Sequence, residues 1–233
     1  MSIVLRPAQD RFHGQHGWLD SRHTFSFADF HDPAHMGFRT LRVINDDQIA
    51  PGEGFGTHPH RDMEILTYVY AGAVEHKDST GAHGITARGD VQRMTAGTGV
   101  RHSEFNASAT VDLQLLQIWI LPEARGLEPG YEQARFDDEA KRDRLRLIAS
   151  HDGRDGSVTL HQDVAIYATM LSAGQSVGHA PAAGRGLWLQ MISGEVEVNG
   201  LLLGAGDGAA IEEVAAIAVT ARSDAEFLLF DLG

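Results

Sequence analysis

Residues 56–72 read Gly-Thr-His-Pro-His-Arg-Asp-Met-Glu-Ile-Leu-Thr-Tyr-Val-Tyr-Ala-Gly and join two histidines to the pattern of a β-strand. In an extended backbone residues two apart project from one side, so the imidazoles of His58 and His60 point together. Pro59 favours this form, because its ring fixes φ and disfavours helix at the preceding residue. The β-branched and aromatic residues 65–70 predict the strand that follows. Two neutral imidazoles side by side form half of a metal site.

A second segment is the candidate for the other half of this site. It reads Gly-Thr-Gly-Val-Arg-His-Ser-Glu-Phe-Asn over residues 97–106, where His102 and Glu104 repeat the spacing of two. Glu64 has the same parity as the first two histidines. Two such pairs, about forty residues apart, suit antiparallel strands that face each other across the mouth of a small barrel. A barrel of that size encloses one small ligand.

The composition is that of a globular protein with ordinary apolar content. The chain has 233 residues, of which 42% are hydrophobic and 22% charged, so we expect one or two domains. No apolar run approaches the ~20 residues of a membrane span, and the N-terminus lacks a signal-peptide core, so the expectation is a cytoplasmic protein with no membrane partner. A net charge of −13 argues against direct nucleic acid binding, which requires a basic face.

The cysteine and histidine counts narrow the chemistry further. The chain has no cysteine, which excludes disulfides, thiolate nucleophiles and cysteine-ligated zinc, so nitrogen and oxygen atoms must hold any metal. Ten of the 13 histidines lie in residues 1–102, which assigns metal chemistry to the N-terminal half. The second half has no His-x-His pair, and we expect it to be structural.

The early histidines leave two interpretations open. They stand among aromatic residues, and they either line a pocket or are hydrogen-bonded in loops, which is the commoner role of a single histidine. This group consists of His13, His16, His23, His31 and His35. The alternation in residues 24–30 predicts a strand with its aromatic side chains inward. Phe25, Phe27 and Tyr68 are candidates to line a pocket, with core packing as the ordinary alternative.

The remaining pattern is one of short strands separated by turns, and it predicts an all-β protein. Asn45-Asp46-Asp47 is typical of a turn. Residues 122–147, with two prolines and two glycines before a charged run at 137–144, indicate a linker between domains. The charged run suits either a short helix or a turn. We therefore predict an N-terminal domain over residues 1–135 and a C-terminal one over 145–233.

Two sets of residues resemble the conserved motifs of the cupin fold. The first set contains the His-Pro-His string and is Gly52, His58, His60, Glu64 and Gly72. The second set contains the other histidine and is Gly89, Gly97, His102 and Asn106. Thr95 stands where the second motif usually has proline. The resemblance implies a bicupin, with two tandem cupin-type β-barrels of the double-stranded β-helix type.

Longer strings resemble the pirin family. They are His58-Pro59-His60-Arg61, Met94-Thr95-Ala96-Gly97-Thr98-Gly99, His102-Ser103-Glu104, and Phe25-Ser26-Phe27-Ala28 with Phe38. The resemblance covers most of the chain and is strongest to short bacterial pirin-like proteins associated with quercetin 2,3-dioxygenase activity. It implies a metal-binding N-terminal cupin and a C-terminal cupin without metal ligands.

The resemblance also implies the site. The metal ligands would be His58, His60, His102 and Glu104, with Glu64 close behind them. Three imidazoles and a carboxylate leave two positions open on an octahedral ion, for a substrate oxygen and for O2 or water. The implied cofactor is one divalent cation, Fe(II) in first place, although Zn, Mn, Co, Ni and Cu suit the same ligands. Glu104 would be both a ligand and the base for the substrate hydroxyl.

The implied reaction is the cleavage of the heterocyclic ring of a flavonol such as quercetin by O2, with release of CO. The partners are then a small aromatic substrate and O2. Two alternatives remain. One is a non-enzymatic metal-binding regulator that acts through a protein partner, and the other is a metal enzyme for another small aromatic or enol.

Overall fold

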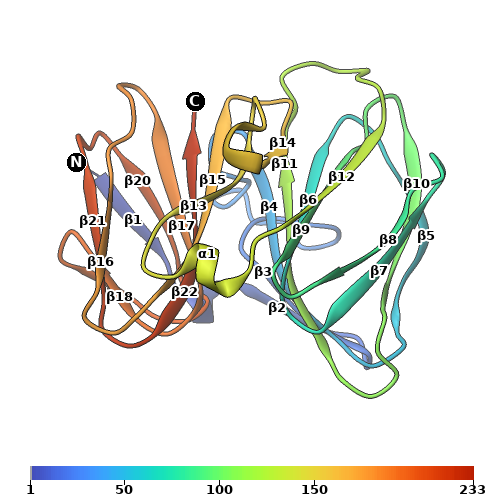
Figure 1. Ribbon diagram of the computed structural model, residues 1–233, viewed down its shortest axis with the longest axis horizontal. Coiled ribbons are helices and arrows are strands. Elements are labelled where there is room, and N and C mark those ends of the chain that lie inside the picture. The colour runs from blue at the N-terminus through green and yellow to red at the C-terminus, as the bar shows by residue number, and fades with distance from the viewer. Residues whose placement is uncertain (1) are drawn as a thin grey trace. The chain divides into compact units, whose positions relative to one another are not determined.

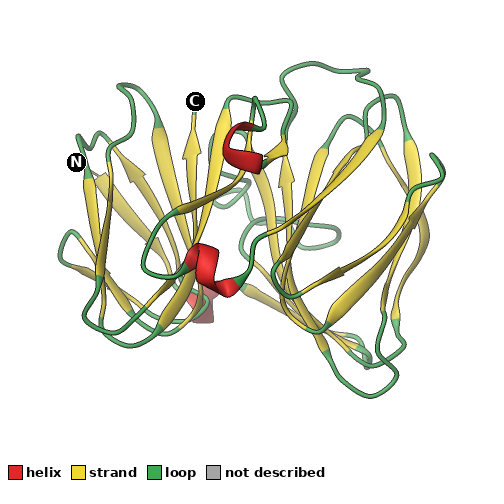
Figure 2. Ribbon diagram, viewed as in Figure 1, coloured by secondary structure: helices red, strands yellow, loops and turns green. Residues whose placement is uncertain are grey.

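The computed structural model describes residues 2–233, which form two compact units (Figure 1). The N-terminal unit comprises residues 12–136 and 158–162, and the C-terminal unit comprises residues 2–11, 137–157 and 163–233. Strands make up nearly all of the regular structure (Figure 2). Among the described residues the one α-helix is α1 (Asp138–Lys141), and two 3-10 turns lie at Ala8–Asp10 and Arg154–Gly156. The prediction of an all-β fold is confirmed.

Two antiparallel sheets build the N-terminal unit, and they are open sheets rather than one closed barrel. The larger sheet has the order β12 (Gly130–Arg135), β9 (Asp90–Thr95), β6 (Glu64–Ala71), β11 (Leu113–Ile120), β4 (Leu41–Ile49), β3 (Leu19–His23) and β2 (Phe12–Gln15). The smaller sheet has the order β5 (Gly54–His60), β10 (Val100–Asn106), β7 (Ala73–Asp78) and β8 (His83–Ala87).

The core of this unit lies between its sheets. One apolar cluster joins Ile49, Val69, Leu113 and Leu115 of the larger sheet to Val74 of the smaller sheet. A second cluster likewise draws on β6, β9 and β10. Burying a side chain of this size stabilises the fold by about 1.5–3 kcal/mol. The two sheets are therefore held face to face at these clusters, and polar side chains can occupy the space that the clusters leave.

The C-terminal unit repeats the arrangement of a large and a small antiparallel sheet. The large one carries β1 (Ser2–Arg6), β20 (Gly208–Glu212), β17 (Gly186–Ser193), β22 (Ala225–Leu232), β15 (Val164–Leu171) and β13 (Arg146–Ser150) in this order. The small one carries β16 (Ser176–His179), β21 (Ile217–Ala221), β18 (Val196–Val198) and β19 (Leu201–Leu203). One apolar core draws on both sheets, and β22 is buried along its whole length.

The limits of the compact units differ from the predicted limits of 1–135 and 145–233 in two places. Residues 2–11 belong to the C-terminal unit, because β1 pairs with β20 from Ser2 opposite Glu212 onward. Residues 158–162, with β14 (Val158–Thr159), belong to the N-terminal unit. There the Thr159 carbonyl accepts a hydrogen bond from Arg93 at 2.8 Å. The order of segments in the sequence does not reveal such long-range pairing.

The segment predicted to be a linker, residues 122–147, contains a strand and a short helix. Its residues 130–135 form β12, which pairs with β9 along its length, so the prediction of a linker is wrong there. Of the two interpretations of the charged run, the helix is confirmed as α1. The Asp137 carboxylate caps this helix by accepting a hydrogen bond from the Ala140 amide at 2.8 Å.

Two local predictions are wrong. Residues 24–30 form no strand, because the Ser26 hydroxyl bonds to both the amide and the carbonyl of Asp32 and closes a loop instead. Asn45-Asp46-Asp47 is not a turn but lies inside β4. Turn-forming residues are tolerated there because β4 is paired on both sides, with β3 and β11.

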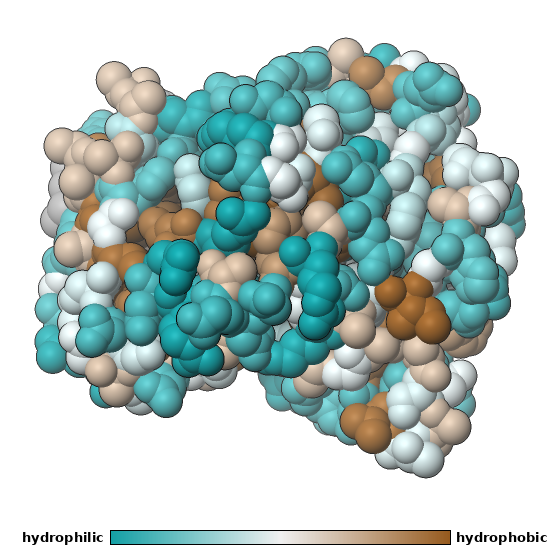
Figure 3. All heavy atoms as spheres, viewed as in Figure 1, coloured by the Kyte–Doolittle hydropathy of each residue, from teal (hydrophilic) through white to brown (hydrophobic). Residues whose placement is uncertain are grey.

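The surface in the view of Figure 3 is mostly hydrophilic, with hydrophobic side chains in small separate groups. The exposed large hydrophobic residues come from separate strands and loops, and they are Val4, Ile85, Phe105, Val111, Leu121 and Leu202. Across residues 2–233, the structure has no helix with the length and apolarity that crossing a membrane requires.

Candidate metal centre and its cavity

The two histidine-bearing segments are neighbouring strands. β5 and β10 pair antiparallel, with His58 directly opposite His102 and His60 opposite Val100. The two pairs thus lie side by side in one sheet. The prediction that they face each other across the mouth of a barrel is wrong. A methyl group on Gly54 would lie 2.2 Å from the carbonyl oxygen of Glu104, so only glycine permits this close pairing.

His58, His60 and His102 form a compact trio. One ring nitrogen from each lies within 4.8 Å of the others, and the ring centroids are 4.4–4.9 Å apart. Burial, reinforced by the neighbouring histidines, lowers the pKa of His60 to about 4 and that of His102 to about 2. These two imidazoles are therefore neutral near pH 7, the form that offers a lone pair to a metal.

Hydrogen bonds fix which nitrogen of His58 is free. Its Nδ1 lies 2.8 Å from the carbonyl oxygen of Gly56, which can only accept a hydrogen bond, so Nδ1 carries the proton. The lone pair of this histidine is consequently on Nε2.

A series of hydrogen bonds from Asp78 through His76 fixes which nitrogen of His102 is free. His76 lies beside it on β7 and is fully buried, and its Nε2 is 3.1 Å from a carboxylate oxygen of Asp78, to which it donates. The Nδ1 of His76 must then accept, and it lies 3.5 Å from the Nδ1 of His102. His102 is left with a lone pair on Nε2, which is buried and has no hydrogen-bond partner. An unpaired buried nitrogen is costly in a protein, and a bound cation would satisfy it. The trio therefore fits a metal ion.

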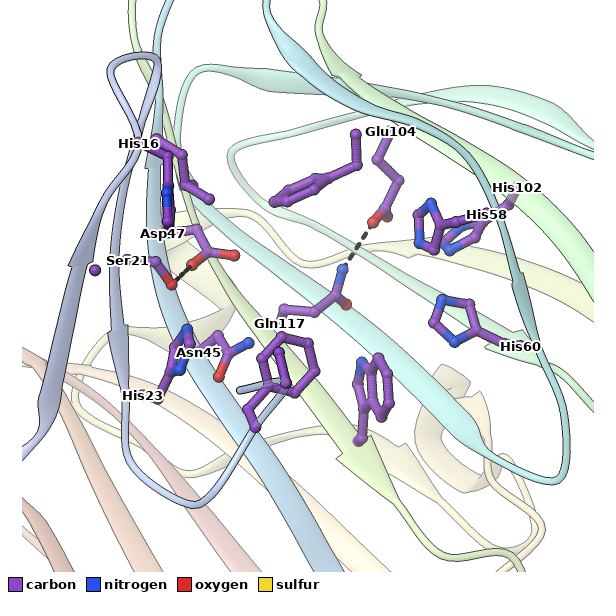
Figure 4. Close-up of a pocket in the computed structure, with 16 residues that line it drawn as sticks. His16, Ser21, His23, Asn45, Asp47, His58, His60, His102, Glu104 and Gln117 are labelled. Atoms are coloured by element: carbon purple, nitrogen blue, oxygen red, sulfur yellow. Dashed lines mark hydrogen bonds between the residues drawn. The ribbon is translucent and has the colours of Figure 1, made fainter. Parts of the chain in front are cut away.

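Glu104 is held firmly beside the trio. It is 3% exposed, and one carboxylate oxygen accepts hydrogen bonds from Thr67 at 3.2 Å and Gln92 at 2.7 Å. The other oxygen accepts one from Gln117 at 2.7 Å (Figure 4). Burial raises the pKa of this carboxyl, against the opposing effect of the nearby histidines and hydrogen bonds.

The structure does not gather the four predicted ligands into one group. They divide between two overlapping groups, and the second group also contains His76. His58, His60 and His102 form the first, and His76, His102 and Glu104 form a second with ligating atoms again within 4.8 Å. His102 belongs to both. The assignment of these side chains as metal ligands stays a prediction.

Glu64 lies elsewhere. Its buried carboxylate accepts a hydrogen bond from Thr95 at 3.1 Å and lies 3.4 Å from the Nδ1 of His161. The even spacing from His60 to Glu64 does not place Glu64 beside the histidines, because strand β5 ends at His60. The chain then turns through Asp62, whose φ is 49°, before β6 begins in the other sheet.

The trio and Glu104 stand at one side of a cavity of about 290 Å³ within the N-terminal unit. Aromatic side chains of Phe27, Phe55 and Trp119 line it. Of the other aromatic candidates, Phe25 and Tyr68 are buried in the core and do not line this cavity.

Two of the five early histidines, His16 and His23, line the cavity, so the pocket interpretation is confirmed for them. His13 and His35 bond to Asp20 and Asp32, as the interpretation of hydrogen-bonded histidines expects.

Sequence reasoning missed several polar residues around the site, namely Asn45, Asp47, His76, Asp78, Gln92 and Gln117. A signal existed for two of them, because His76 and Asp78 repeat the spacing of two seen in His102 and Glu104. Gln117 is one of two glutamines in the mostly apolar strand β11, which also marks a position that can face a polar group.

Comparison with protein families gives two matches that together span most of the chain. Residues 6–120 match the model described as Pirin, and residues 147–232 match the one described as the quercetinase C-terminal cupin domain. Two facing sheets in each unit agree with cupin domains, so the predicted bicupin architecture is confirmed, with open sheets in place of closed barrels.

Individual relatives extend these matches over the full length. The chain is 53% identical over 230 residues to a quercetin 2,3-dioxygenase of Escherichia coli strain K12, covering 99% of this chain and 98% of that protein. It is 42% identical over 231 residues to a pirin-like protein of Caulobacter vibrioides, covering 98% and 99%. The crystal structure of the E. coli pirin YhhW in complex with nickel(II) superposes with a TM-score of 0.94 at 52% identity, covering 99% of each chain.

Proposed function

The chain belongs to the pirin family, and from this membership we propose that it is a metal-dependent dioxygenase of flavonols such as quercetin. The reaction would open the heterocyclic ring with O2 and release CO. The observation that carries the proposal is the trio of His58, His60 and His102, gathered at one side of a cavity with aromatic walls. The name of the E. coli relative and the nickel complex of YhhW support it.

We propose His58, His60, His102 and Glu104 as the ligands of one divalent cation. The donor set contains nitrogen and oxygen only, which suits Fe(II), our first choice, and also Zn, Mn, Co, Ni and Cu. A bound cation would lower the pKa of a flavonol hydroxyl and so favour the electron-rich flavonolate. The protein's task is to offer lone pairs in fixed directions, and the hydrogen bonds on His58 and His102 do this.

Glu104 is the proposed base for the substrate hydroxyl. Burial raises the pKa of its carboxyl, and a carboxylate with a raised pKa is better able to take up a proton. Its hydrogen bonds to Gln92 and Gln117 fix the position of the oxygens. Phe27 and Trp119, which meet edge to face with centroids 5.3 Å apart, provide an apolar wall suited to a planar ring and restrict the entry of water.

The test is turnover by protein loaded with each metal in turn. We expect loss of the flavonol absorbance with quercetin, with uptake of one O2 and release of one CO per flavonol consumed. Elemental analysis of protein purified without added metal identifies the native ion. Absence of turnover with every metal would favour a regulator that acts through a protein partner. Slow turnover of quercetin beside fast turnover of another enol would favour a different substrate.

Removing the ring nitrogens of His76 is expected to weaken metal binding about 10–100-fold. His102 then loses the hydrogen-bond partner that keeps its proton on Nδ1 and its lone pair on Nε2. The variant His76→Phe keeps the ring and its stacking on Tyr131, at a centroid distance of 4.7 Å. The measurement is the metal Kd from competition with a chelator. The matched control is His83→Phe, on the next strand, where the exposed imidazole bonds to Glu75. An unchanged Kd in His76→Phe would contradict this role.

A further inference from the structure

The wall of the cavity opposite the trio carries four polar side chains that the proposed reaction does not use. Ser21 and His23 come from β3, and Asn45 and Asp47 come from the neighbouring strand β4. In the pairing of these strands Ser21 lies opposite Asp47, and His23 lies opposite Asn45. Figure 4 shows the four on one side of the cavity and the three histidines with Glu104 on the other. All four are buried, and we call them the polar wall.

Several atoms of this region lack hydrogen-bond partners. The Nδ1 of His23 and the Oδ1 of Asn45 are buried without one, as is the Nε1 of Trp119, which lines the same cavity. Leaving a buried polar atom without a hydrogen-bond partner destabilises the folded protein. The indole nitrogen of Trp119 can only donate, the Oδ1 of Asn45 can only accept, and the Nδ1 of His23 does either according to its tautomer. Three such atoms around one cavity indicate a ligand that supplies polar groups there.

Asp47 is the most unusual member of the polar wall. It is 4% exposed, and its Oδ1 accepts a hydrogen bond from the Ser21 hydroxyl, but no cationic side chain among the described residues pairs with it. Burial raises the pKa of this carboxyl to about 7. Its Oδ2 accepts no hydrogen bond within the described part of the chain. A hydroxyl donor from a ligand would fill this position.

The charges around the cavity limit the kind of ligand. Asp47 and Glu104 both carry buried carboxyl groups, and burial raises the pKa of each. The carboxylate of Glu104 also contributes to the raised pKa of Asp47. An anionic group such as a carboxylate or phosphate would meet repulsion at this wall. A neutral hydroxyl can donate to Asp47 and accept from a neighbour, so it satisfies the wall without adding charge.

We propose that Ser21, His23, Asn45 and Asp47 form a subsite for a hydroxyl-bearing aromatic ring, in which Asp47 accepts the hydrogen bond of a phenolic hydroxyl. The subsite rests on the proposed function in one respect, namely that the same ligand reaches the trio with its other end. The subsite then selects among flavonols by the hydroxyls on the ring that lies away from the metal centre.

The first test uses the metal-free full chain and small probes, so it does not depend on turnover. Catechol carries two hydroxyl donors, and 1,2-dimethoxybenzene has the same ring without them. The indole N–H signal of Trp119 reports binding in an NMR titration. We expect catechol to bind saturably and more tightly than its dimethyl ether. Equal binding of the two probes, or no saturable binding of catechol, would overturn the subsite.

Variants assign the effect to the polar wall. Asp47→Asn keeps the size and still accepts from Ser21, and we expect it to weaken catechol binding about tenfold. Asn45→Leu removes a second polar group and is expected to act in the same direction. The matched control is Asp46→Asn, the same change one residue earlier on β4, where the carboxylate accepts from the Tyr70 hydroxyl at 2.7 Å and does not line the cavity. Catechol binding by Asp47→Asn at the level of this control would refute the role of Asp47.

Turnover separates this inference from the function itself. If flavonols are cleaved, Asp47→Asn should raise the KM of a flavonol with two hydroxyls on its pendant ring and leave that of the analogue without them unchanged. Equal changes for both substrates would overturn the subsite while the dioxygenase function stands. If no flavonol is cleaved, the proposed function fails, and the catechol titration still decides for or against the subsite.

Discussion

The variant His102→Ala is expected to lose both bound metal and flavonol cleavage. His102 belongs to both groups of potential metal ligands, and its buried Nε2 has no hydrogen-bond partner among the described residues. Because changing a residue behind a ligand already costs about 10–100-fold in affinity, losing the ligand itself should raise the metal Kd by more than ~100-fold. Turnover at equal metal concentration should fall by at least the same factor. Elemental analysis after dialysis and the flavonol assay measure the two effects.

The control for this variant is another histidine of the N-terminal unit. His161→Ala changes a partly exposed imidazole that lies near Glu64 and Thr95 and does not line the cavity. It should keep the metal and the activity of the parent. If His102→Ala retained one metal per chain after dialysis, this histidine would not be a ligand, and the proposed centre would have to be built from other side chains.

The sequence predicts the pairing of side chains within each strand of the site, because strand geometry is periodic. A spacing of two on an extended backbone places His58 beside His60, and the same spacing brings His102 and Glu104 to one face of β10. The sequence pattern does not predict which strands are neighbours in the sheet. The pairing of β5 with β10, which puts His58 opposite His102, depends on the whole sheet and becomes visible only in the structure.

Errors arose where a local pattern was extended beyond one element. The spacing from His60 to Glu64 places both on one face only in a continuous strand, whereas the chain turns at Asp62 and continues in a different sheet. The local preferences of Asn45 and Asp47 predict a turn, but pairing on both sides of β4 outweighs these preferences. The polar wall could therefore not be predicted from the sequence. Its four residues have no distinctive spacing, and only the structure shows that they line one cavity.

The variant Glu104→Gln should fold less stably and lose most of its activity. Three donors, from Thr67, Gln92 and Gln117, point at the two oxygens of this carboxylate. A glutamine has one oxygen, so its NH2 group must face at least one of these donors, which costs about 1–3 kcal/mol. As the proposed base, the lost carboxylate should lower turnover about 10²–10⁴-fold. Thermal unfolding and the flavonol assay at saturating metal measure the two effects.

The matched control is Glu64→Gln, which alters another buried carboxyl of the same unit outside the cavity. Even if Glu64→Gln is less stable than the parent, its turnover per folded, metal-loaded chain should stay within about twofold of the parent's turnover. The metal content of Glu104→Gln then separates the two roles of the carboxylate. Retained metal with lost turnover assigns Glu104 as a base, whereas loss of both assigns it as a ligand as well. Parent-level metal and turnover would mean that the carboxylate has neither role, because an amide can neither take up the substrate proton nor replace an anionic ligand.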